Sequence, residues 1–245
     1  MPTDLSIVIT FEFTISIIGF LIVSIPLLKK YKARKSNVTL LVFLATTADL
    51  LGGFLSAIGR VLRYTGLWQI QPGVKLELLT FTVAFIAISD AFFFAFTLEV
   101  FRGGLSQGKN KTLAGLFFLI VAIYVVYDFA TGLFQVDLTL MIWLILIGLT
   151  FFAMIYLTAK AWGASRKFEN RVDNLCSKLI ALGSFFLVIA FIFHAIESVL
   201  TYANGGVTQY SIYYFIGWTL ILVAIFILST GYLQPDWLKR RIEAK

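Results

Sequence analysis

The chain has 245 residues, of which 60% are hydrophobic and only 13% are charged. A soluble domain carries about 25% charged residues, and a globule of this size cannot hide so much apolar surface from water. This composition excludes a soluble globular protein and indicates a protein that exposes an apolar exterior to lipid. The formal net charge of +7 would suit nucleic acid, but the positions of the basic residues argue against that partner.

Seven apolar runs have the length needed to cross a bilayer, about 20 residues for a hydrocarbon core of about 30 Å. Backbone groups in lipid must be satisfied within the segment, so each run is predicted to be a helix. The fold class is therefore all-α, a polytopic membrane helix bundle formed as one domain over residues 1–245. The predicted transmembrane helices cover residues 5–28, 38–60, 77–101, 112–134, 138–160, 176–201 and 210–233, and a short basic tail covers 234–245.

The basic residues predict how the bundle is oriented. Only Arg60, Arg63 and Lys75 fall on one side of the seven crossings, and the other 17 of the 20 Lys and Arg residues fall on the opposite side. Cytoplasmic loops carry an excess of Lys and Arg, so we predict that the N-terminus lies outside and the C-terminus in the cytoplasm. The expected partner of the basic face is the lipid bilayer rather than nucleic acid, and the expected location is the cytoplasmic (plasma) membrane.

Ionisable side chains inside the predicted helices are candidates for function, because they are rare and costly in hydrocarbon. Counted by helical rise, four of them fall in the outer half, whereas Asp49 and Asp90 fall near the midplane. Glu99 is expected to pair with Arg102 or with the cytoplasmic interface. The full set is Glu12, Asp49, Asp90, Glu99, Asp128, His194 and Glu197.

Spacings of three or four residues place these side chains on polar stripes, one for each helix. We expect the stripes to converge on a single cavity that opens outward and closes near Asp49 and Asp90. The alternative is polar packing, through pairs such as Arg60–Glu12 or His194–Asp128. The predicted ligand- or ion-binding residues are Asp49, Arg60, Asp90, His194, Glu197, Glu12, Asp128 and Tyr214.

Two further patterns concern packing and metal binding. The helix at 138–160 has no ionisable side chain inside it and is expected to be peripheral. Small residues form a ridge that favours close helix packing within the bundle, at Ala84, Ala87, Ala91 and Ala95.

His194 and Glu197 share a helix face and are weak candidates for a divalent metal site, although a polar pair is the simpler interpretation.

Several kinds of chemistry are excluded by what the sequence lacks. The helix at 210–233 has no lysine for a retinal Schiff base, and the single histidine excludes both a two-histidine haem and a three-histidine zinc site. Common hydrolase, metalloprotease and phosphate-loop motifs are also missing. We therefore expect no cofactor and favour a protein that is not an enzyme.

The exit from the last helix, Gly231-Tyr232-Leu233-Gln234-Pro235-Asp236-Trp237-Leu238-Lys239-Arg240-Arg241, carries a Pro-x-Trp and basic cluster. It resembles the exit from the seven-helix membrane sensor regions of prokaryotic, especially archaeal, sensor kinases. The resemblance covers this short motif and the helix count. It implies a bacterial or archaeal sensor that signals to a cytoplasmic domain, although no output domain follows in this chain.

The leading hypothesis is a seven-helix sensor or receptor-like protein that binds a small ligand or ion from outside and signals to a cytoplasmic partner. A second hypothesis is a proton or cation transporter or channel, in which Asp90 acts as a proton carrier because hydrocarbon favours its neutral form. A third is a membrane enzyme that modifies lipid through its carboxylates. The bulky side chains at Phe92, Phe93, Phe94 and Phe96 predict an apolar floor below Asp90, which favours a closed pocket over a transport path.

Overall fold

The computed structural model describes residues 5–65, 78–134, 139–203, 211–236, 238 and 240, and the elements assigned within these residues are all helical. Seven helical stretches are long and apolar enough to cross a membrane, as predicted. The seven stretches indicate an integral membrane protein. The elements are α1 (Leu5–Gly19), η1 (Phe20–Ser24), α2 (Ile25–Arg34), α3 (Asn37–Tyr64), α4 (Leu78–Phe101), α5 (Gly108–Phe134), α6 (Thr139–Ser165), α7 (Arg171–Ala203) and α8 (Ile212–Leu233).

The first span is the most irregular, because α1, the π-helical turn η1 and α2 follow one another without a break from Ser6 to Arg34. Pro26 lies in the first turn of α2 and has no backbone N–H to donate to the carbonyl four residues earlier. A π turn widens the helix just before such a position and so lets the chain continue across the proline. The helix ends at Arg34, and its C-cap residue Lys35 has a left-handed φ of 46°.

The spans predicted from hydropathy are too short where basic residues continue a helix. The first span was predicted to end at residue 28 and continues to Arg34, and the sixth begins at Arg171 rather than at 176. The extra turns carry lysine and arginine, which fit the interface and favour helix but contribute nothing to an apolar run.

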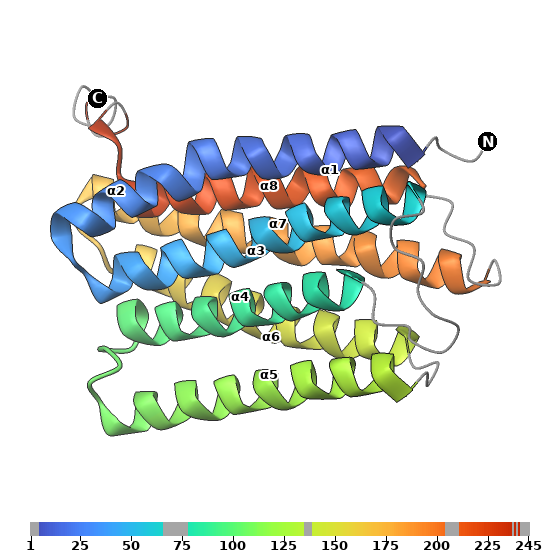
Figure 1. The fold of residues 1–245 in the computed structure, drawn as a ribbon. Helices are drawn as coiled ribbons and strands as arrows, with labels where there is room; N and C mark the ends of the chain where they lie inside the picture. Colours follow the sequence, from blue (N-terminus) through green and yellow to red (C-terminus); the bar gives the residue numbers. More distant parts are fainter. Residues whose placement is uncertain are drawn as a thin grey trace.

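The helices form one bundle whose centre is α4, and α3, α5 and α6 all pack against it. The neighbours α6–α7 and α7–α8 complete the bundle, and α1 packs between α3 and α8, as Figure 1 shows. The beginning of α1 and the end of α8 lie at opposite ends of the bundle (Figure 1).

The expectation that the helix at 138–160 is peripheral agrees only in part with the structure, where 39% of this span is buried. This helix is α6, which packs against both α4 and α7, whereas α5 packs mainly against α4. Only 28% of the α5 span is buried, compared with 78% of the α4 span. An apolar helix without ionisable groups can pack through aromatic and small side chains, so the lack of charge does not predict lipid exposure.

Small residues set the closest helix contacts. A Cβ added to Gly183 of α7 would lie 2.7 Å from the backbone oxygen of Ala224 in α8, and one added to Gly231 would lie 2.7 Å from the Cys176 oxygen. The alanine ridge of α4 is also buried, with exposures of 6% at Ala84 and 0% at Ala87. Its role in packing within the bundle therefore agrees with the structure.

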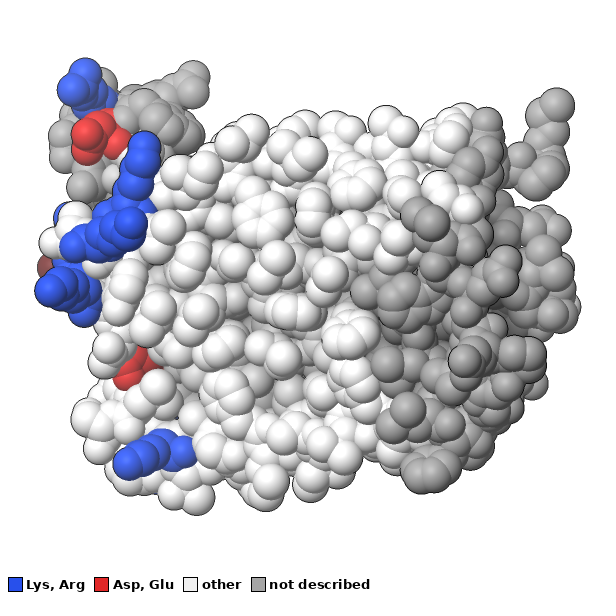
Figure 2. Space-filling view, in the orientation of Figure 1, with Lys and Arg blue, Asp and Glu red and all other residues white. Residues whose placement is uncertain are grey.

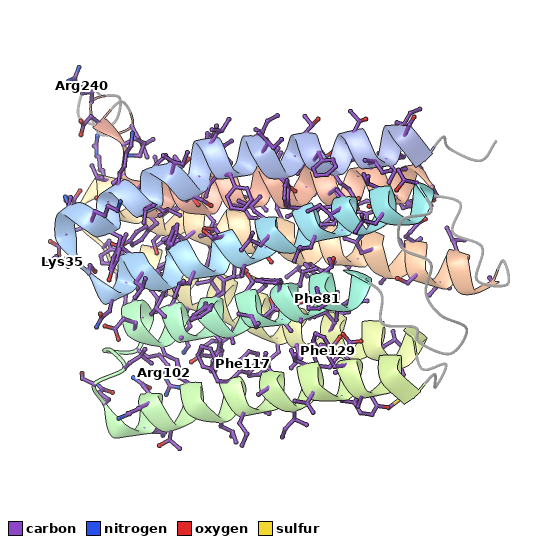
Figure 3. All side chains as sticks on the ribbon, viewed as in Figure 1. Lys35, Phe81, Arg102, Phe117, Phe129 and Arg240 are labelled. Carbon is purple, nitrogen blue, oxygen red and sulfur yellow. The ribbon has the colours of Figure 1, made fainter. Side chains whose placement is uncertain are left out.

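Charge is unevenly distributed over the described surface. Figure 2 shows a broad band without charged side chains, and lysine and arginine gather at the end of the bundle where α2 ends. The labelled residues Lys35, Arg102 and Arg240 lie at this same end (Figure 3). We call it the basic end and the other the α8-start end. Each of the seven spans runs between them.

Candidate functional site

A fully buried carboxylate joins three helices near the α8-start end. Glu12 of α1 accepts a hydrogen bond of 2.9 Å from Ser56 Oγ and forms an ion pair of 2.9 Å with Nε of Arg60, both on α3. The Tyr214 hydroxyl of α8 also donates to Glu12, and Arg60 Nη2 donates to that hydroxyl over 3.2 Å. These four residues are the Glu12 cluster, and they form the Arg60–Glu12 pair that the packing alternative predicted.

Sequence spacing explains how the cluster forms. Ser56 and Arg60 are one helical turn apart on α3, so both side chains reach the same carboxylate on α1. The Glu12 side chain has no exposed surface, whereas Arg60 keeps 18% of its side chain accessible. Arg60 is therefore the member that can meet a molecule from outside the bundle.

The Trp218 side chain closes the Glu12 cluster toward the middle of the bundle. A Cβ at Gly53 would lie 2.9 Å from Cζ3 of this indole and 3.0 Å from Ser16 Oγ, so the glycine makes room for the ring. Gly53 is about one turn from Ser56 on one side and one turn from Asp49 on the other. The ring thus lies between the Glu12 cluster and the midplane carboxylates.

His194 of α7 contacts two aromatic residues of α8. Its ring centroid lies 6.0 Å from that of Tyr214 and 5.6 Å from that of Trp218. Two buried nitrogens here, His194 Nε2 and Trp218 Nε1, have no hydrogen-bond partner of ordinary geometry. The proposed His194–Asp128 pair is therefore not formed through Nε2.

Glu197 organises the start of α8. Its Oε1 accepts a hydrogen bond of 3.1 Å from the Ser211 backbone N–H, and its Oε2 accepts one from the Ser211 hydroxyl. Ser211 is the N-cap of α8, and its Oγ accepts from the Tyr213 N–H over 3.2 Å. A carboxylate next to a helix N-terminus is stabilised by the peptide dipoles, so Glu197 has a structural role here.

The structure gives the weak metal hypothesis for His194 and Glu197 no support. Both oxygens of Glu197 are occupied by Ser211, and the described residues contain no group of three or more His, Cys, Asp or Glu placed to hold a metal ion. A third ligand would be needed for a protein site of this kind.

A second polar group lies in the middle of the bundle, between α3, α4 and α6. The Thr150 hydroxyl of α6 donates a hydrogen bond of 2.6 Å to Oδ2 of Asp90 on α4. Asp49 of α3 lies within electrostatic range of Asp90 and next to Ser89. We call Asp49, Ser89, Asp90 and Thr150 the Asp90 cluster. Its members are all buried.

Asp128 is a buried carboxyl of α5. Tyr124, one turn away on α5, lies within electrostatic range of both Asp128 and Asp90. Both Tyr124 and Asp128 are buried, with exposures of 4% and 6%. Tyr124 is therefore the residue of α5 that connects Asp128 to the surroundings of Asp90.

The predicted site residues are thus divided between two groups instead of forming one. Glu12, Arg60 and Tyr214 meet near the α8-start end together with His194, whereas the Asp90 cluster lies beyond the Trp218 ring. The reason is local: a large indole fills the space that Gly53 leaves open on α3. Glu197 lies near the first group but binds Ser211.

Of the two roles expected for Glu99, the described contacts do not show the pairing with Arg102. Glu99 Oε2 accepts a hydrogen bond from the backbone N–H of Leu105, and Arg102 instead donates to the Tyr156 hydroxyl over 3.2 Å. Glu99 therefore closes the loop between α4 and α5, where Gly103 and Gly104 both have positive φ. Two glycines in this conformation let the chain turn within a few residues.

Sequence reasoning did not identify Thr150 or Ser89 as site residues. A hydroxyl in an apolar helix can satisfy itself on a carbonyl of its own helix, as Thr97 does with the Phe93 oxygen. Nothing in the sequence separates such a residue from one that faces a carboxylate on another helix.

Comparison with known proteins does not assign this arrangement to a family. No protein-family model matches the chain, and neither curated proteins nor solved structures give a significant match. Functional argument therefore depends on the geometry of the two polar groups.

Proposed function

We propose that this protein is a seven-helix membrane sensor that binds a small polar ligand beside the Glu12 cluster. The observation that carries the proposal is the buried nitrogen His194 Nε2, left without a hydrogen-bond partner beside a buried ion pair. Buried polar groups are nearly always satisfied, so such an atom calls for a partner that the chain does not provide. A ligand with hydrogen-bonding oxygen or nitrogen atoms would supply it.

The arrangement suits signalling because the ligand would act on α8. The start of this helix is held by the Glu12 cluster through Tyr214 and by Glu197 through Ser211. A ligand that took over the Arg60 or Tyr214 hydrogen bonds would favour a different packing of α8 against α1 and α3. The equilibrium between the two packings of α8 shifts only if the ligand binds one packing more tightly than the other.

The far end of α8 is attached to α2 and α3, where a signal would leave the membrane. Lys30 Nζ donates to the backbone oxygens of Tyr232 and Leu233 over 2.9 and 3.3 Å. Thr39 and Tyr232 share a hydrogen bond of 2.5 Å between their hydroxyls. We call these contacts the exit latch, and we propose that ligand binding alters it.

The orientation follows from the charge asymmetry. We propose that the basic end faces the cytoplasm and the α8-start end faces outward, which gives an external N-terminus and a cytoplasmic C-terminus. The membrane would be the cytoplasmic membrane of a bacterium or archaeon, as the helix-exit resemblance implies. A cytoplasmic signalling partner would contact the basic loops and the tail.

Transport is the less favoured reading, because large apolar side chains fill the bundle between the Asp90 cluster and the basic end. Phe93, Phe96 and Leu98 of α4 have no exposed surface. A proton or cation path would need polar groups or water through this layer. Between Asp90 and the basic end, the buried side chains of α4 offer only Thr97, whose hydroxyl is bonded to the Phe93 oxygen.

A ligand screen tests the sensor proposal. Purified protein in nanodiscs is screened by thermal unfolding against small carboxylates, amino acids, amines and inorganic ions. A ligand of the proposed site raises the unfolding temperature of the wild type, and His194→Gln and Trp218→Phe abolish that rise. Thr219→Val is the control, because this hydroxyl is exposed and bonded within its own helix.

A second measurement separates sensing from transport. The same ligand should change the distance between spin labels on the tail and on the α2–α3 link, with no flux of the ligand or of protons into proteoliposomes. Flux that is lost in Asp90→Asn would replace the sensor proposal with transport.

A further inference from the structure

Arg102 and Lys160 are two half-buried cations at the basic end, and both contact the same tyrosine. Arg102 Nη1 donates a hydrogen bond of 3.2 Å to the Tyr156 hydroxyl, and Lys160 Nζ lies 5.4 Å from the centroid of the Tyr156 ring. Arg102 directly follows α4, whereas Tyr156 and Lys160 are one turn apart on α6. We call these three residues the Tyr156 cluster. It gathers positive charge from two separate elements of the chain.

The Tyr156 cluster contains no acidic partner for its two positive charges. Among the described residues, no Asp or Glu forms an ion pair with Arg102 or Lys160. The carboxylate of the adjoining loop, Glu99, is bonded to the Leu105 backbone N–H instead. Like charges repel one another, and an anion between them replaces that repulsion with attraction. The cluster is therefore suited to a negatively charged partner.

The backbone at Arg102 is fixed, which prepares its side chain for binding. Asn110 is 2% exposed, and its Nδ2 donates to the backbone oxygens of Arg102 and Gly104, over 2.9 Å in each case. An arginine that is held in place loses less conformational freedom when it binds. Its planar guanidinium also matches two oxygens of a phosphate group. Phosphate is therefore the anion that the cluster suits best.

An apolar surface continues from the Tyr156 cluster toward the middle of the bundle. Phe152 is one turn from Tyr156 on the same face of α6, and the two rings are parallel within 6° at a centroid distance of 6.3 Å. Phe152 also stacks on Phe117 of α5 at 5.7 Å, yet it remains 55% exposed. Phe117 lies farther from the basic end than Arg102 does (Figure 3). A hydrocarbon chain that starts at the cluster therefore meets an exposed aromatic surface.

We propose that the Tyr156 cluster binds the phosphate of an anionic phospholipid, with an acyl chain of the same lipid against Phe152. Basic pockets between transmembrane helices bind anionic lipid headgroups in this way. Arg102 and Lys160 supply the positive charge, and the Tyr156 hydroxyl, which accepts from Arg102, keeps its own proton to donate to a phosphate oxygen. The charged and apolar parts of the surface thus follow the order of the charged and apolar parts of a lipid.

The proposal goes beyond ligand sensing, because the Tyr156 cluster lies at the basic end and the Glu12 cluster lies near the α8-start end. The lipid would join the loop after α4 to α6 and would occupy the leaflet at the basic end. Failure of the lipid site would leave the outer ligand site untouched, and the reverse also holds.

Native mass spectrometry of the purified full chain provides the test. The probes are phosphatidylglycerol and phosphatidylcholine with the same acyl chains. The dissociation constant should be about 25-fold lower for phosphatidylglycerol, because each basic residue near an anionic lipid contributes about fivefold. Glycerol 3-phosphate carries the phosphate without the chains and should not displace the bound lipid at equal concentration.

Variants decide whether the preference belongs to this cluster. Arg102→Gln and Lys160→Gln should each weaken phosphatidylglycerol binding about fivefold and leave phosphatidylcholine binding unchanged. Tyr156→Phe keeps the stacked ring, removes the acceptor of Arg102 and should weaken the same binding. Lys167→Gln is the matched control, because it removes one exposed positive charge from the same end of the bundle. It should leave the preference for phosphatidylglycerol intact.

Four results would overturn the proposal. The first is equal binding of the two lipids, and the second is a preference that survives when Arg102→Gln and Lys160→Gln are combined. The third is an equal loss in Lys167→Gln, which would mean a general attraction of the basic end. The fourth is displacement by glycerol 3-phosphate, which would mean a phosphate site without a lipid. Thermal unfolding in phosphatidylcholine checks that each variant is folded, and if Arg102→Gln is not, Lys160→Gln and Tyr156→Phe decide the outcome.

Discussion

Arg60 on α3 and Glu12 on α1 form an ion pair of 2.9 Å in which the carboxylate side chain is completely buried and the guanidinium keeps 18% of its surface. Glu12 is therefore part of the protein interior, whereas Arg60 can still contact molecules from outside the bundle. Removing either partner leaves the other in a partly desolvated place without its counter-charge.

A double-mutant cycle measures this relationship. Glu12→Gln should lower the free energy of unfolding by about 2–3 kcal/mol, toward the low end of buried pairs because Arg60 is partly accessible. Arg60→Gln should cost a similar amount, and the double variant should cost less than the sum, which gives a coupling of about 1–2 kcal/mol. Additive losses would show that the two residues stabilise the protein independently.

Glycine at position 183 is predicted to be essential for the contact between α7 and α8. Gly183→Ala places a Cβ 2.7 Å from backbone atoms of α8, which cannot rotate away as a side chain would. The helices must separate, so the free energy of unfolding should fall by about 2–3 kcal/mol. Gly148→Ala is the control, because a Cβ there meets nothing within 4 Å. Alanine favours a helix more than glycine does, so Gly148→Ala should not lower this free energy, and an equal loss in both variants would contradict the packing argument.

Much of this fold follows from the sequence, because the length and hydropathy of seven runs are sufficient to predict the spans. The Arg60–Glu12 pair could also be predicted, because one base and one acid near the same depth in the bundle have few other partners. What the sequence does not contain is the rotation of each helix against its neighbours. That rotation depends on close approaches such as the one at Gly53, where Trp218 enters.

The division of the site residues into two groups is a consequence of that rotation. Polar stripes on separate helices predict that each stripe avoids lipid, but they do not predict which stripes meet. Asp128 and His194 were expected to share a site, yet Asp128 lies near Tyr124 and His194 packs against Trp218. Glu197 was expected to bind a ligand and instead holds the N-cap Ser211.

The hydrogen bond between Thr150 and Asp90 is predicted to stabilise the centre of the bundle. Thr150→Val keeps the shape of the side chain and removes the donor, so Asp90 loses its 2.6 Å partner. The expected cost is about 1 kcal/mol, as for other polar contacts between membrane helices. Thr97→Val is a stricter control than an exposed position, because this residue is buried on α4 and its hydroxyl is bonded to the Phe93 oxygen of its own helix. An equal loss of unfolding free energy in the two variants would show that the hydrogen bond to Asp90 does not stabilise the bundle more than a hydrogen bond within one helix does.

The start of α8 is predicted to depend on Ser211 more than on other hydroxyls nearby. Ser211→Ala removes the N-cap oxygen and one of the two bonds to Glu197, at an expected cost of about 1–2 kcal/mol. Hydrogen exchange at the first turn of α8 should quicken as a result. Ser198→Ala on α7 removes a hydroxyl bonded only to the His194 carbonyl and should leave that exchange unchanged.

The exit latch predicts that the tail becomes more mobile when Tyr232 loses its hydroxyl. Tyr232→Phe removes the 2.5 Å hydrogen bond to Thr39 but keeps the ring beneath Lys30, whose Nζ lies 4.3 Å from the ring centroid. The ring therefore keeps its contacts with Lys30 and Phe96, so the fold should lose only about 1 kcal/mol. A spin label at position 240, introduced as Arg240→Cys in a Cys176→Ser background, should show faster motion in Tyr232→Phe. Tyr213→Phe, at the opposite end of α8, should leave the label unaffected.

If the motion is the same in all three proteins, the Thr39–Tyr232 bond does not restrain the tail. In that case Lys30, which holds the two last carbonyls of α8, is the remaining restraint, and Lys30→Gln should release the label instead.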